Sequence, residues 1–130
     1  FSVTDGNSNI TFAIANTGEL GLLTDAVRLT STKVESNTNA TFILSSFPAN
    51  TFIGGKYIIT GKKQNDVHIS EIILTQNGTN AFWNVYGTSI SNTSLYAFSA
   101  NVSANMVSLL LTPTTNANVI YKILEQRITF

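Results

Sequence analysis

The sequence predicts an all-β protein: an antiparallel β-sandwich, jelly-roll-like or closed into a small barrel, without significant helix. Alternating apolar and polar residues recur along the chain in short runs, and turn-forming residues separate those runs. No segment combines a helical period with capping residues. The strongest single signal lies between Val67 and Tyr86, where Asn77 and Gly78 join two β-rich runs as in a tight hairpin.

A two-residue type I′ turn at Asn77 and Gly78 would fix the register of this hairpin, because both positions need a positive φ. In this predicted register, Leu74 lies opposite Ala81. Side chains alternate between the two faces of a strand, so each face can be listed, and both are largely apolar. One face carries Ile72, Leu74, Trp83 and Val85, and can cover the chain's own core. The other face needs a second cover, and we predict it as an assembly interface formed by Ile69, Ile73, Phe82 and Tyr86.

The remaining strands follow from the same pattern, at residues 1–15, 20–23, 26–30, 40–47, 56–64, 95–102, 106–112 and 119–130. A second hairpin has Ala104 and Asn105 as its turn. Its apolar face pairs Val102 with Val107, Ala100 with Leu109 and Phe98 with Leu111. Its other face is expected to be solvated and carries Ser99, Asn101, Ser103, Ser108 and Thr112.

The pair Gly54-Gly55 suggests a bend and a division of the chain. Residues 54–130 are predicted to form a β-sandwich module. Residues 1–53 form an N-terminal β segment that is either stalk-like or part of the same sandwich. Because the chain opens on Phe1 without an initiator Met, we expect it to be processed or to belong to a longer protein.

Composition excludes several classes of function. Charged residues make up 11% of the chain and the net charge is zero, against about 25% charged residues in ordinary soluble domains. We therefore expect no nucleic-acid partner and no membrane partner. The chain has no cysteine, which rules out disulfides and thiolate chemistry. No apolar run reaches the ~20 residues of a transmembrane helix.

Three residues with catalytic side chains, Asp66, His68 and Ser70, alternate on one face of a predicted strand. Residues two apart are separated by about 6.6 Å along a strand, too far for the direct hydrogen bonds of a triad. We interpret them as the polar end of a strand. His68 is the only histidine, so one chain holds no multi-histidine metal site, although a threefold axis could gather three copies.

Other motifs have ordinary structural explanations. Lys56 follows the glycine pair but Tyr57 stands where a phosphate-binding loop needs Ser or Thr. The carboxylates single out no catalytic pair. A platform for binding a sugar could be formed by Trp83, Tyr86 and Tyr96. Aromatic residues on strands more often belong to a core. Five glycosylation sequons, expected by chance in a chain so rich in Asn, Ser and Thr, begin at Asn9, Asn39, Asn77, Asn92 and Asn101. We predict neither an enzyme nor a cofactor.

The segments SEIILTQNGTNAFWNVYGT and LYAFSANVSANMVSLLLTPTTNANVIYKILEQRIT resemble a module of structural proteins of tailed bacteriophages, especially those infecting cyanobacteria. In that module a Glu-aliphatic strand precedes an Asn-Gly turn, and an aromatic strand ending in Tyr-Gly-Thr follows. Here these features are Glu71, Asn77-Gly78 and the strand from Phe82 to Thr88. A V-x-L-L-x-T-P strand comes later, here Val107 to Pro113. The pattern departs at Ala104-Asn105, where the family usually has Gly-Gly or a similar pair.

The resemblance implies a virion protein without known catalysis: a tail fibre, a spike or a capsid-decorating element, located in the extracellular virion. Its expected partners are copies of itself, in a homotrimer because phage fibres are commonly trimeric, and other virion proteins. Two alternatives stay open. One is a module that binds host-surface glycan through loop aromatics. The other is a subunit of a secreted filament whose N-terminal strand completes a neighbour's sheet.

Overall fold

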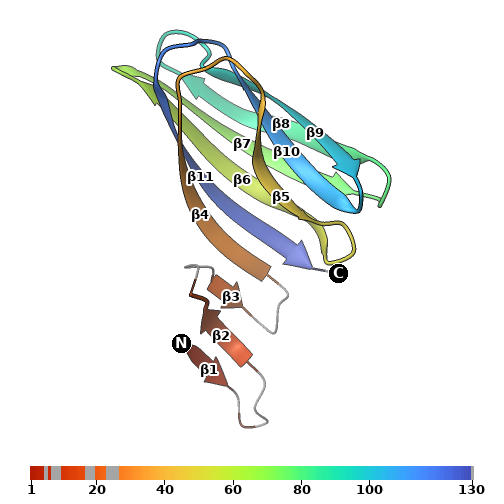
Figure 1. Ribbon diagram of the computed structural model, residues 1–130. Helices are drawn as coiled ribbons and strands as arrows, with labels where there is room; N and C mark the ends of the chain where they lie inside the picture. Colours follow the sequence, from red (N-terminus) through yellow and green to blue (C-terminus); the bar gives the residue numbers. More distant parts are fainter. Residues whose placement is uncertain (5, 7–9, 17–19, 23–26, 130) are drawn as a thin grey trace.

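The computed structural model describes residues 1–4, 6, 10–16, 20–22 and 27–129. Within these ranges every regular element is a strand, and the strands form an eight-stranded sheet and a three-stranded sheet (Figure 1). All pairings are antiparallel. The predicted all-β class is therefore confirmed. The sheets pack face to face as an open sandwich and do not close into a barrel.

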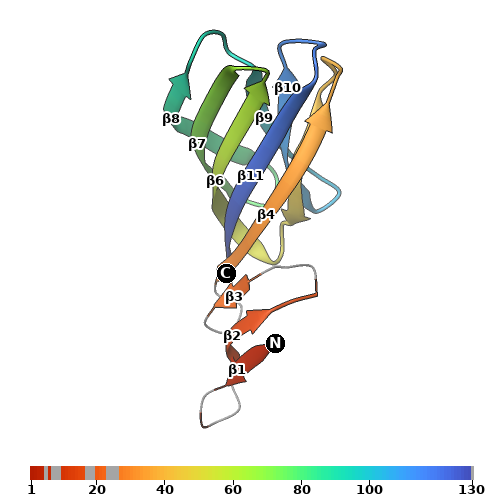
Figure 2. The same cartoon turned by 90° about the vertical axis from the view of Figure 1, so that its left-hand side faces the viewer.

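The large sheet is built around the last strand of the chain. Its order is β1 (Ser2–Thr4), β2 (Ile10–Ile14), β3 (Leu20–Leu22), β4 (Val27–Ser36), β11 (Val119–Thr129), β6 (Phe52–Lys63), β7 (Asp66–Gln76) and β8 (Ala81–Ile90). The small sheet has the order β5 (Phe42–Pro48), β10 (Met106–Pro113) and β9 (Tyr96–Ser103). Strands β1 to β3 continue the large sheet beyond the end of the sandwich (Figures 1 and 2).

The core lies between the two sheets, because alternate residues of their strands point inward. Its fully buried side chains include Phe47, Tyr57, Ile59, Ile72, Leu74, Leu95, Val107, Leu109, Leu111, Val119 and Tyr121. Gly61 makes room for two of the core aromatics. A Cβ at this position would lie 3.0 Å from the ring of Tyr96 and 3.4 Å from the ring of Tyr121.

Strand pairing does not stop at the predicted division of the chain. Both β4 and β5 precede residue 54, and they pair with β11 and β10. Gly54 and Gly55 lie inside β6, next to a β-bulge against β11. The need for glycine comes from close packing, since a Cβ on Gly54 would lie 2.1 Å from the carbonyl oxygen of Leu74. The stalk-like role of residues 1–53 remains a prediction.

The loop of the β7–β8 hairpin is longer than predicted, so the predicted register is wrong. Gln76 pairs with Ala81, and Leu74 pairs with Trp83. The Asn77 N–H donates to the Asn80 carbonyl at 3.1 Å, which closes a four-residue loop. Among the described residues, Gly78 has a positive φ of 87° and Asn77 does not. The shift is by two residues, so every side chain stays on its predicted face.

The β9–β10 hairpin has the predicted register. Val102 pairs with Val107, Ala100 with Leu109 and Phe98 with Leu111. Ala104 and Asn105 both have a positive φ, 49° and 61°, as a type I′ turn requires. One residue of the polar face differs from expectation: Ser108 is buried, because β10 is the central strand and the Ser108 hydroxyl lies 3.4 Å from that of Ser46.

Candidate interaction surface

The face of the large sheet that is turned away from the small sheet is called the outer face here (Figure 2). The structure places all four predicted interface residues on it, spread over β7 and β8. Ile69 is 41% exposed, Ile73 53%, Phe82 51% and Tyr86 44%. Leu124 and Ile128 of β11 are also exposed. Several large apolar side chains on one face are unusual for an isolated domain, and such patches mark interaction sites.

The opposite face of the same hairpin is only partly covered. Ile72 and Leu74 are buried against the small sheet, as predicted, whereas Trp83 is 41% exposed and Val85 38%. The difference arises because β8 is an edge strand, paired with β7 alone. Edge strands usually carry charged residues or proline that discourage further pairing, and β8 carries neither.

A β-bulge organises the middle of the outer face. Ile72 pairs with Val85 and Glu71 pairs with Gly87, so Tyr86 is the extra residue. The Tyr86 ring centroid lies 5.8 Å from Lys56 Nζ, and this nitrogen lies 3.7 Å from a Glu71 oxygen. A hydrogen bond to Tyr86 and the charge of Glu71 raise the pKa of Lys56 above its usual value. Tyr86 therefore stands beside a cation on the outer face.

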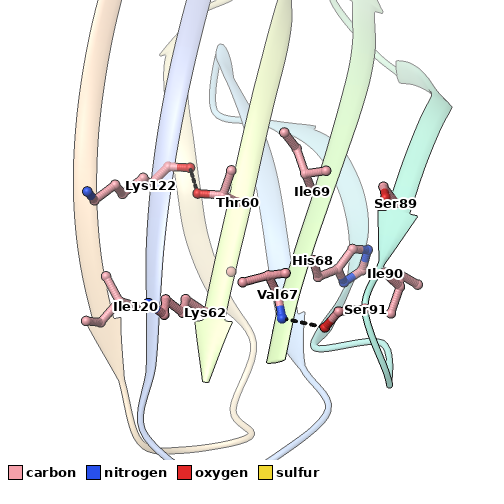
Figure 3. Close-up of a pocket in the computed structure, with 11 residues that line it drawn as sticks. Thr60, Lys62, Val67, His68, Ile69, Ser89, Ile90, Ser91, Ile120 and Lys122 are labelled. Atoms are coloured by element: carbon pink, nitrogen blue, oxygen red, sulfur yellow. Dashed lines mark hydrogen bonds between the residues drawn. The ribbon is translucent and has the colours of Figure 1, made fainter. Parts of the chain in front are cut away.

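At the other end of these strands the outer face is hollowed (Figure 3). The hollow has a volume of about 540 Å³. We call it the lysine hollow; its lining residues are Thr60, Gly61, Lys62, Val67, His68, Ile69, Ser89, Ile90, Ser91, Ile120 and Lys122. They come from four neighbouring strands, β11, β6, β7 and β8, and from the start of the loop after β8. Ile69 lines the hollow and is also one of the four predicted interface residues.

His68 and Ser70 contact each other directly, so the spacing argument against this contact is wrong. His68 Nε2 lies 3.2 Å from Ser70 Oγ, because the imidazole reaches along the strand. His68 Nδ1 accepts the Leu95 N–H at 3.2 Å, which leaves the ring proton of the neutral form on Nε2. Burial lowers the pKa of His68 and favours this form. Nε2 then donates to Ser70 and cannot accept a proton from it.

Asp66 takes no part in that arrangement. Its carboxylate lies 3.6 Å from Lys63 Nζ and accepts a hydrogen bond from Asn92 Nδ2 at 3.3 Å. His68 is buried, and its ring stacks on Tyr96 at a centroid distance of 3.9 Å. Three copies of His68 therefore cannot meet on a symmetry axis without unfolding β7. The three residues make direct structural contacts, His68 with Ser70 and Leu95, and Asp66 with Lys63 and Asn92.

The other sequence-based candidates are placed as follows. Tyr96 is buried, so the three suggested aromatics do not form one sugar platform. Asn39, Asn77, Asn92 and Asn101 are exposed, and Asn9 lies outside the described residues, as does Phe130. Across the described ranges no cluster of three or more His, Asp or Glu could hold a metal ion. In the same ranges no helix is long and apolar enough to cross a membrane.

Sequence reasoning missed an ion pair between buried Glu125 and partly buried Arg127 on the inner face of β11. The Arg127 Nε donates to Glu125 Oε1 at 2.5 Å, and the hydroxyls of Ser45 and Tyr57 donate to the same oxygen at 2.7 and 3.1 Å. Burial, followed by the nearby charge of Glu125, raises the pKa of Tyr57. Alternation could have revealed this pair, because Tyr121 and Ile123 precede it on the same face.

Comparison with known proteins finds similarity only at the level of structure. No family model and no curated protein matches. The tailspike protein of Acinetobacter phage vB_ApiP_P1 is similar with a TM-score of 0.55 and 14% identity, over 73% of this chain and 21% of that chain. The tailspike protein of Acinetobacter baumannii phage AM24 has a TM-score of 0.54 and 7% identity, over 81% of this chain and 26% of that chain.

A third similar structure is tailspike protein gp49 of Acinetobacter baumannii bacteriophage Fri1, a capsular polysaccharide depolymerase. Its TM-score of 0.47 is too low to relate the two proteins further. The first two similarities establish a shared fold. The structurally similar proteins come from phages, in agreement with that part of the resemblance, and their hosts are Acinetobacter rather than cyanobacteria. This chain spans only a minor part of each of them.

Proposed function

We propose that this chain is a β-sandwich domain of a tailed-phage virion protein, in a tail fibre, a spike or a capsid-decorating element. In this proposal it acts by associating with copies of itself and with other virion proteins outside the cell. One observation carries the proposal: the exposed apolar side chains of Ile69, Ile73, Phe82 and Tyr86 lie together on the outer face. The shared fold with two phage tailspike proteins supports the virion setting.

The size of the outer face suits an assembly contact. Beyond the lysine hollow, four strands spaced about 4.8 Å apart and about six residues long present roughly 400 Å². A specific protein interface buries about 800 Å² on each partner, so this surface would supply about half of one contact and the β8 edge would add to it. At about 25 cal/mol per Å² of apolar surface, covering it favours association by several kcal/mol before entropic costs. The trimeric state rests on the resemblance to phage fibres.

Light scattering on the purified chain tests this proposal. We expect a trimer at micromolar concentration, and we expect Ile73→Lys to dissociate it. The matched control is Ile43→Lys, because Ile43 is 58% exposed but lies on the small sheet. A wild-type monomer would overturn self-association, and a dimer would overturn the threefold symmetry alone. Equal effects of the two variants would show that the outer face is not the contact.

We also propose that the domain has no hydrolase activity of its own. The support is the arrangement of its polar groups: both His68 nitrogens are engaged, and Glu125 is buried beside Arg127. Turnover of a host polysaccharide that is lost on changing Asp66, Glu71 or Glu125 would contradict this. The donor-strand filament gains no support, since β1 pairs with β2 of the same chain. A glycan partner is favoured by one observation, the lysine hollow.

A further inference from the structure

We propose that the lysine hollow binds a carboxylate-bearing oligosaccharide. This inference rests on the proposed virion role and deepens it, because it gives the chemical class of the glycan partner. The hollow is built from two rows of residues across the sheet. In one row Thr60 lies opposite both Lys122 and Ile69, and Ile69 lies opposite Ser89. In the adjacent row Lys62 lies opposite Ile120 and Val67.

The two lysines in the lining indicate that the ligand is negatively charged. Lys62 and Lys122 line the hollow from the neighbouring strands β6 and β11. Neither lysine belongs to an ion pair within the described ranges. Every carboxylate in those ranges already has a cation beside it, in the pairs Lys33–Glu35, Lys56–Glu71, Lys63–Asp66 and Arg127–Glu125. In a second copy of the chain, the described ranges therefore contain no carboxylate without a cation beside it. An occupant of the hollow has to bring its own negative charge.

The lining chemistry favours a sugar over a peptide. Val67, Ile69 and Ile120 provide an aliphatic floor that suits the apolar face of a pyranose ring, and hydroxyl groups stand around it. Ser91 Oγ accepts the Val67 N–H at 2.9 Å, so its own proton is free to donate to a ligand. The floor residues lie on β7 and β11, with β6 between these strands, and all three strands are paired on both sides, which prevents a peptide from adding a strand there.

Size and position are also suitable. A volume of about 540 Å³ lies within the range of about 300–1,000 Å³ for small-ligand sites. The hollow occupies the end of β7 near Val67, whereas Ile73 and Phe82 lie toward the loop at residues 77–80. Self-association through Ile73, Phe82 and Tyr86 would therefore leave the hollow open to solvent, with Ile69 at the border of the two surfaces.

Calorimetric titration of the full chain with tetragalacturonate tests the inference, with maltotetraose as the neutral probe and tetraglutamate as the peptide probe. We expect saturable binding of tetragalacturonate alone, weakened by added salt. The double variant Lys62→Gln/Lys122→Gln should weaken it at least tenfold. The control Lys56→Gln/Lys63→Gln removes the same net charge from lysines that are already paired, and should leave the affinity within about twofold.

Each other outcome overturns the inference. Absence of saturable tetragalacturonate binding excludes the site, and equal losses in the two double variants would show attraction to net charge alone. Tighter binding of tetraglutamate would assign the hollow to acidic peptides. Light scattering on the same samples separates this test from the proposed self-association. We expect Lys62→Gln/Lys122→Gln to keep the wild-type oligomeric state, whereas Ile73→Lys changes that state.

Discussion

The two long hairpins of this protein, β9–β10 and β7–β8, differ in how much of their apolar surface the chain itself covers. In β9–β10 the apolar face packs into the core, and the other face carries hydroxyl and amide groups. In β7–β8 both faces are apolar, yet only Ile72 and Leu74 are fully covered. The first hairpin is completed within the chain. The second presents apolar surface that, by our proposal, another subunit covers.

The largest difference in stability is expected between a substitution at a buried residue of one hairpin and a substitution at an exposed residue of the other. Leu109→Ala should lower the free energy of unfolding by about 2–5 kcal/mol, because Leu109 is fully buried in β10. Ile73→Ala on the outer face of β7 should change the stability of the monomer by no more than about 0.5 kcal/mol. Denaturant unfolding of samples diluted to the monomeric state measures both. Similar losses would contradict the assignment of the two faces.

A smaller effect is expected where the two hairpins meet. The Tyr96 hydroxyl of β9 donates to the Ile59 carbonyl at 3.0 Å and reaches the His68 carbonyl and Ser70 Oγ at 3.3 Å. Tyr96→Phe leaves these buried acceptors without that donor and should cost about 1–3 kcal/mol. Tyr86→Phe, on the exposed outer face, is the matched control and should cost less than about 0.5 kcal/mol. Denaturant unfolding measures both variants, and equal losses would contradict the structural role of the Tyr96 hydroxyl.

The Tyr96 side chain also makes the free energy of unfolding depend on pH. Burial raises the pKa of Tyr96 to about 12, above its ordinary value of 10.0. The unfolded chain therefore loses this proton first, and stability falls as the pH rises from 10 toward 12. Tyr96→Phe should show a shallower alkaline loss of stability than the wild type. Parallel pH profiles would contradict the buried, proton-donating role of Tyr96.

Alternation predicted the faces of both hairpins, because within a stretch of strand without a bulge a side chain's face depends only on whether its position is odd or even. This explains why Ile73 and Phe82 were assigned correctly although the β7–β8 register was off by two residues. The error came from Asn77, whose Oδ1 accepts the N–H groups of Thr79 and Asn80 and so builds a longer loop. Local sequence does not distinguish that loop from a two-residue turn.

The lysine hollow had no signal in the sequence. It exists because β11 lies between β4 and β6, which brings Ile120 and Lys122 beside Thr60 and Lys62 from a distant part of the chain. The ion pair of Glu125 with Arg127 was accessible by alternation, but its burial depends on β5 covering the inner face of β11, where Ser45 contacts Glu125. Features that depend on strand order could not be predicted from local patterns.

The last comparison concerns the two hairpin turns, which differ in how well their residues suit a positive φ. Gly78 has a φ of 87°, and a Cβ at this position would meet no atom within 4 Å, so substitution there is penalised by backbone conformation alone. Gly78→Val should therefore cost about 1–3 kcal/mol.

Ala104 has a φ of 49°, a conformation that glycine adopts more readily, so Ala104→Gly should instead stabilise by up to about 1 kcal/mol. Thermal unfolding of the two variants should show opposite shifts of the midpoint. Destabilisation by both, or no loss in Gly78→Val, would show that the turns are not limited by backbone conformation.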